Sequence, residues 1–103
     1  MLSYIIDGFC SETYKVAATD TSQALDVNKL ESNGRLCRSV LITVEGNSIR
    51  VGHGNAPIQS TGIGHLFNSG DIIFLNSGIA AKQFRFVKAS ASDSASIQVS
   101  VFF

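Results

Sequence analysis

The stretch VLITVEGNSIRV, residues 40–51, decides the fold class. On both sides of its central Glu-Gly-Asn, every second side chain is apolar: Val40, Ile42 and Val44 come first, then Ile49 and Val51. A period of two places one apolar face against a core, as in a half-buried β-strand. Gly and Asn in the short connection favour a tight turn. The stretch therefore predicts two strands joined as a hairpin.

The same alternation recurs outward from this stretch in both directions. It is clearest at the C-terminus, where residues 97–103 alternate Ile, Val, Val and Phe with other side chains. Residues 72–75 are apolar on both faces, as in a buried strand. Residues 24–30 fit a short strand or one helical turn, and the all-β context favours the strand. Further alternating runs lie at residues 14–18, 36–44 and 84–87, and turn signals lie at residues 33–34, 68–71 and 76–78.

This pattern predicts an all-β fold with no convincing helix. Seven to eight strands spaced by about ten residues are typical of an antiparallel β-sandwich with jelly-roll or Greek-key wiring. The 103 residues fit a single domain, 1–103, and residues 1–12 form either an N-terminal arm or the first strand. An apolar fraction of 45% is enough for one core without a metal or disulfide.

The charge distribution argues against nucleic-acid and membrane partners. Eight basic residues balance eight acidic ones and form no cluster. No apolar stretch approaches the ~20 residues of a membrane span. The N-terminal apolar run is short and lacks a preceding basic segment, so no signal peptide is predicted and we expect synthesis in the cytoplasm.

The sequence carries no recognisable catalytic or metal-binding motif. The acidic residues are scattered, and most lie at turns or strand ends. His53 and His65 flank the same irregular loop, but no third ligand lies at motif spacing, and zinc sites need three or four. Cys10 and Cys37 lack the spacing of a metal or redox motif, and we expect two reduced thiols. We therefore predict no enzyme activity, no cofactor and no metal.

Two segments are candidate protein-contact surfaces. The first is the apolar N-terminal segment, in which an exposed patch would mark an interaction site. The second is the irregular loop of residues 52–64, which holds four glycines and the only proline, since loops on rigid scaffolds commonly carry binding. The candidate interface residues are Leu2, Tyr4, Ile5, Ile6 and Phe9 in the first segment, and His53, Asn55, Pro57, Ile58 and His65 in or beside the second.

Residues 40–103 resemble a family of small virion proteins of tailed bacteriophages. The resemblance rests on a strand, a Gly/Asn turn with proline, an aromatic strand and a terminal alternating strand. The residues that carry it are Ile49-Arg50-Val51, Ala56-Pro57, Thr61, Gly64-His65-Leu66, Gly70-Asp71, Phe84-Arg85-Phe86 and the run from Ile97 to Phe103.

The resemblance implies a structural role in the phage particle. Small β-sandwich or jelly-roll proteins of this kind serve as capsid decoration, or cement, proteins. The implied partners are the major capsid protein and the chain itself, as a homodimer or homotrimer, on the capsid exterior. The alternative is a neck, tail or fibre component, including a receptor- or glycan-binding module. The absence of Trp and the presence of only two Tyr lower the glycan-binding interpretation.

Overall fold

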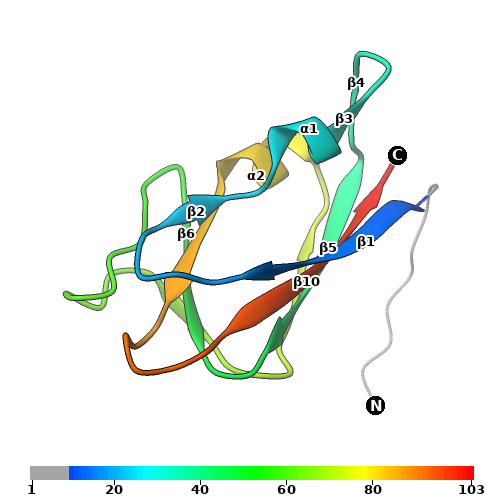
Figure 1. Ribbon diagram of the computed structural model, residues 1–103. Coiled ribbons are helices and arrows are strands. Elements are labelled where there is room, and N and C mark those ends of the chain that lie inside the picture. The colour runs from blue at the N-terminus through cyan, green and yellow to red at the C-terminus, as the bar shows by residue number, and fades with distance from the viewer. Residues whose placement is uncertain (1–9) are drawn as a thin grey trace.

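The computed structural model describes residues 10–103 and places ten strands and two short helices in them. The all-β prediction is confirmed. Eight strands form two four-stranded antiparallel sheets, and the other two form a small hairpin (Figure 1). In chain order the elements are β1 (Cys10–Ala17), β2 (Gln23–Ala24), α1 (Val27–Leu30), β3 (Glu31–Ser32), β4 (Arg35–Leu36), β5 (Ser39–Glu45), β6 (Ile49–His53), β7 (His65–Phe67), β8 (Ile72–Leu75), α2 (Gly78–Gln83), β9 (Phe84–Lys88) and β10 (Ser96–Phe102).

The strand pairing is nested along the chain. β1 pairs with β10, β2 with β9, β5 with β8, and β6 with β7. Two more pairings, β10 with β5 and β9 with β6, complete sheet A in the order β1-β10-β5-β8 and sheet B in the order β2-β9-β6-β7. A nested antiparallel ribbon rolled into two sheets is the wiring of a jelly roll, one of the two predicted topologies.

Both sheets contribute to one hydrophobic core. In sheet A the inner-face residues of β5 and β10 are fully buried, as the alternation of residues 40–44 and 97–101 predicts. In sheet B, Phe84 and Phe86 of β9 are the largest buried side chains. Burial of one such side chain contributes about 1.5–3 kcal/mol. The core therefore supplies the rigid scaffold on which the loops are mounted.

The predicted hairpin over residues 40–51 is wrong, although both of its strands exist. β5 lies in sheet A and β6 in sheet B, so the connection between them crosses from one sheet to the other. Gly46 makes this crossing with φ of +81°, and a Cβ there would lie 2.6 Å from the Ser94 carbonyl oxygen. The pairing was predicted wrongly because alternation is a property of a single strand and does not identify the strand with which it pairs.

Three local predictions also need correction. Of residues 24–30, only Ala24 lies in a strand, as the end of the two-residue β2. Residues 27–30 instead form α1, which Asp26 caps by accepting a hydrogen bond from the Asn28 amide at 2.9 Å. The strand predicted over residues 36–44 is interrupted between β4 and β5. Ser77 begins helix α2, since its Oγ accepts from the Ala80 amide at 3.0 Å. The strands beyond the predicted seven to eight are β3 and β4, which flank the predicted Asn33-Gly34 turn.

The prediction of a strand buried on both faces also fails for β8. Within the described part of the chain, this strand lies at an edge of sheet A, where it pairs with β5 alone. Phe74 on its outer face is 44% exposed. The other three edges are β1 in sheet A, and β2 and β7 in sheet B. Within residues 10–103, neither helix is long and apolar enough to cross a membrane.

Candidate protein-binding loop

The segment between β6 and β7, residues 54–64, folds back onto the outer face of sheet B. Its fold depends on two glycines that allow close approach of the main chain. A Cβ at Gly52 would lie 2.4 Å from the Asn55 carbonyl oxygen, and a Cβ at Gly64 would lie 2.8 Å from the Pro57 Cβ. Gly64 also has φ of +126°, which favours glycine. We call residues 54–64 the β6–β7 loop.

Arg50 of β6 anchors the returning part of this loop. Its Nη1 donates a hydrogen bond to the Gly64 carbonyl oxygen at 3.0 Å. A Cβ at Gly62 would lie 3.7 Å from the other terminal nitrogen of the same guanidinium. Opposite Arg50 on β9 lies Val87, which is 1% exposed although it stands outside the main core cluster. Arg50, which anchors the loop, therefore stands beside an outer-face position that is closed to solvent.

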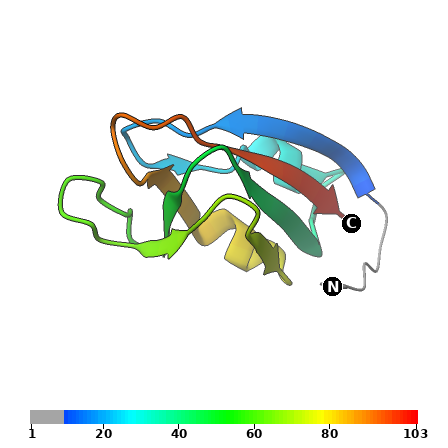
Figure 2. The same ribbon diagram turned by 90° about the horizontal axis from the view of Figure 1, so that it is seen from below.

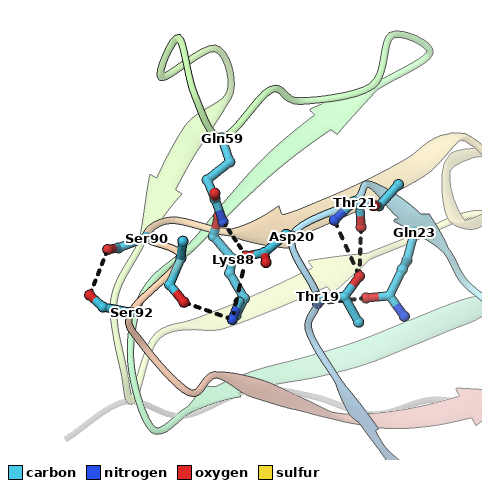
Figure 3. Close-up of polar contacts among 9 residues, drawn as sticks. Thr19, Asp20, Thr21, Gln23, Gln59, Lys88, Ser90 and Ser92 are labelled. Carbon is cyan, nitrogen blue, oxygen red and sulfur yellow. Dashed lines mark hydrogen bonds and ion pairs between the residues drawn. The ribbon is translucent and has the colours of Figure 1, made fainter.

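Gln59 provides a second anchor at the far side of the loop (Figure 3). Its Nε2 donates to Asp20 Oδ1 at 2.9 Å and to the Lys88 carbonyl oxygen at 3.2 Å. Lys88 Nζ lies 3.4 Å from the same Asp20 oxygen and donates to the Ala91 carbonyl oxygen at 3.2 Å. The hydrogen bond from Gln59, together with the Lys88 charge, lowers the pKa of Asp20. The β1–β2, β6–β7 and β9–β10 connections are thus tied together.

The anchored loop holds apolar side chains in solvent. Ile58 and Ile63 form an isolated antiparallel bridge, with reciprocal main-chain hydrogen bonds of 2.9 and 3.1 Å. Directly opposite residues in such a pair point to the same face. Ile58 is 45% exposed and Ile63 is 56% exposed. Leu66, three residues further along in β7, is 50% exposed. Figure 2 shows this green segment reaching beyond the sheets.

The contact residues predicted from the sequence differ in their exposure in the structure. Ile58, Asn55 and His65 are exposed, as a contact surface requires. His53 is also exposed, and its ring packs edge-on against Phe84 with a centroid distance of 5.8 Å. Pro57 is buried beneath the loop, so its role is internal packing and the prediction of a contact residue is corrected. The predicted arm over residues 1–12 lies outside the described residues, except for positions 10–12, which belong to β1. The candidate contact residues of this arm also lie outside them: Leu2, Tyr4, Ile5, Ile6 and Phe9.

Sequence reasoning missed Ile63, Leu66 and the two anchors. An apolar residue beside glycine in a polar loop was the available signal for Ile63, since its neighbours are Gly62 and Gly64. Nothing local marks Arg50 or Gln59 as anchors, because their partners lie far away in the chain. Arg50 instead resembled an ordinary strand-surface charge.

The described part of the chain holds no cluster of three or more His, Cys, Asp or Glu residues that could ligate a metal ion. Cys10 is exposed and Cys37 is buried, and both are free thiols. Burial raises the pKa of the Cys37 thiol. His53 and His65 lie on different strands, β6 and β7, and His65 is paired with Val51.

A second polar arrangement lies where β1 meets α1. Lys29 Nζ is 2.7 Å from Glu12 Oε2 and 4.7 Å from the centre of the Tyr14 ring. The Tyr14 hydroxyl is buried without a hydrogen-bond partner among residues 10–103. Burial, followed by the nearby carboxylates of Asp26 and Glu12, raises the pKa of Tyr14 to about 12. The Tyr14 phenol is therefore neutral at neutral pH.

One shallow, open depression lies at the opposite sheet. Two charged residues, two serines, two alanines and a glycine line it, and it contains no aromatic residue. Sugar-binding sites commonly use an aromatic face, so the lining does not favour a glycan site. The residues that line it are Lys15, Ala17, Glu45, Gly46, Ser94, Ala95 and Ser96.

Comparison of the chain with protein-family models, with curated proteins and with solved structures finds no match in any of the three.

Proposed function

We propose that the chain is a non-enzymatic structural protein of a virion, a capsid decoration protein that binds across neighbouring major capsid protein subunits. The β6–β7 loop is its contact with the capsid. The proposal combines the sequence resemblance to small tailed-phage virion proteins with the jelly-roll scaffold and its exposed apolar loop. Such a protein stabilises the assembled shell by mass action, because it binds the assembled lattice and not the separate subunits.

The observation that carries the proposal is the exposure of Ile58 and Ile63 on an anchored loop. Single exposed apolar residues are ordinary on protein surfaces. Here, however, two are paired across a bridge, and hydrogen bonds from Arg50 and Gln59 hold the loop in place. The loop is therefore ordered before binding, which lowers the entropic cost of association. Apolar side chains presented in this way fit a protein surface better than a charged ligand.

The deciding experiment is cryo-electron microscopy of virions produced by the phage that encodes the chain. We expect density for the jelly roll repeated over the head lattice, with the β6–β7 loop against the capsid subunits. Density confined to a few copies at the portal or on the tail contradicts decoration and supports the neck or tail alternative. The absence of the chain from purified virions contradicts both readings.

A binding assay with undecorated heads tests the contact itself. Ile63→Asp places a charge on the exposed apolar pair of the loop and should abolish binding, because the charge must be desolvated at the interface. The matched control is Ile79→Asp, since Ile79 is 66% exposed but lies on α2. Equal binding by the Ile63→Asp variant and the wild type would remove the loop from the interface.

A further inference from the structure

Among residues 10–103, the edge of β8 pairs with no other strand and is unlike the other three sheet edges. Exposed edges in native proteins usually carry charges, proline, bulges or very short strands that prevent pairing with another chain. β1 carries Glu12 and Lys15 and has an irregular register between Cys10 and Glu12. β2 and β7 have only two and three residues. β8 has four residues, Ile-Ile-Phe-Leu, and none of these protections.

The main-chain groups of β8 that face outward follow from its pairing with β5. Bonded and non-bonded residue pairs alternate along an antiparallel ladder. The Val44 amide donates to the Asp71 carbonyl oxygen at 3.0 Å, so the pair that follows, Thr43 with Ile72, is non-bonded. The alternation then directs the amides and carbonyls of Ile73 and Leu75 toward β5. Those of Ile72 and Phe74 point to the free edge.

We propose that β8 pairs antiparallel with the β8 strand of a second copy of this chain, which joins two copies of sheet A into one continuous sheet. A two-fold axis perpendicular to the sheet keeps like faces together, and it pairs the most residues of β8 when it passes beside Ile73 or beside Phe74. Both registers place apolar side chains opposite one another. This contact is isologous, the commonest arrangement in homodimers.

Electrostatics permit this contact between identical molecules. The chain has a formal net charge of zero, so two copies do not repel strongly. Asp71 is the nearest charged residue before β8, and Lys82 is the nearest after it. In the register centred on Phe74, Asp71 lies opposite Ser77 of the second copy. No pair of like charges is therefore brought face to face, which would destabilise paired strands.

The β8 contact is separate from the β6–β7 loop and does not depend on the proposed function. It also explains why a strand with apolar residues on both faces lies at an edge. Phe74, 44% exposed in one copy, would be covered by the corresponding strand of the other. The pairing can be measured on the isolated chain, without any capsid.

Sedimentation over a concentration series up to about 1 mM tests the pairing. We expect the wild-type chain to approach a dimer. Phe74→Lys introduces a charge at the edge and should weaken dimerisation ~10-fold or more, because the two lysines would lie close together. Ile79→Lys is the control, since it changes an exposed apolar residue away from this edge and should leave the dimer intact. Near-ultraviolet circular dichroism verifies that each variant is folded.

Three outcomes contradict the proposal: a monomer throughout the wild-type series, an unaffected Phe74→Lys dimer, or a dimer abolished by Ile63→Asp instead. A cysteine cross-link sharpens the positive result. In a Cys10→Ser background, Phe74→Cys should form an intermolecular disulfide if the axis passes beside Phe74, since paired Cα atoms then lie about 5.5 Å apart. Ile79→Cys in the same background should not cross-link.

Discussion

In the middle of the two sheets, the outer faces follow the same alternation but differ in burial. On sheet A, a row across all four strands runs from Thr13 to Ser100, Leu41 and Phe74, and none of these residues is buried. The corresponding row on sheet B includes Val87, which is 1% exposed. We attribute the difference to the β6–β7 loop, because both of its anchors lie next to Val87: Arg50 pairs with it, and Gln59 donates to the carbonyl oxygen of the following residue, Lys88. Alternation therefore tells which way a side chain points, whereas a distant loop decides whether it is buried.

The largest expected effect on stability comes from a substitution that prevents the β6–β7 loop from approaching sheet B closely. Gly64→Ala should lower the free energy of unfolding by about 3 kcal/mol, because the residue combines a strained φ with a clash against Pro57. Gly70→Ala is the matched control: its φ is +92°, but a Cβ there meets nothing within 4 Å. It should cost only about 1 kcal/mol. Urea denaturation measures both values, and equal losses would mean that the close approach at Gly64 contributes nothing.

An intermediate effect is expected from the covered position itself. Val87→Ala should cost about 2 kcal/mol, since it removes buried methyl groups and leaves a cavity beneath the loop. Thr43→Ala alters a half-exposed position on the outer face of sheet A and should cost less than about 1 kcal/mol. If thermal or urea denaturation shows the same loss for both variants, the loop does not act as a cover.

The smallest effect concerns Tyr14, which lies against the core at the β1 edge of sheet A. Tyr14→Phe should raise the free energy of unfolding by at most ~1 kcal/mol at neutral pH, because a buried hydroxyl without a partner is removed. A loss of stability in this variant would show that the hydroxyl makes a favourable contact.

The same substitution has a pH signature. The pKa of Tyr14 is about 12 in the folded chain against an ordinary value of 10.0, so the unfolded chain releases its proton first as the pH rises. Wild-type stability should therefore fall between pH 10 and 12 by more than that of Tyr14→Phe, as followed by denaturation at each pH. Parallel pH profiles would contradict the raised pKa.

The candidate contact surface was only partly predictable. The irregular loop and Ile58 were found from glycine, proline and polar composition, which act locally. Ile63 became a candidate contact residue only because the structure pairs it with Ile58 in a bridge. Pro57 was misjudged, because its burial depends on the close approach of Gly52 and Gly64, which lie on either side of it in the chain. The proposed dimer edge at β8 was likewise hidden, since an apolar strand at an edge has the same pattern as one in the middle of a sheet.

By itself, the sequence determined the strands, their inward faces and most of the turns, because alternation, glycine and asparagine act over a few residues. Only the tertiary structure decided that residues 40–45 and 49–53 belong to different sheets, that β8 lies at an edge and that Val87 is covered. These outcomes depend on contacts between segments far apart in the chain. Such contacts depend on how the whole core packs, and no single stretch of the sequence contains that information.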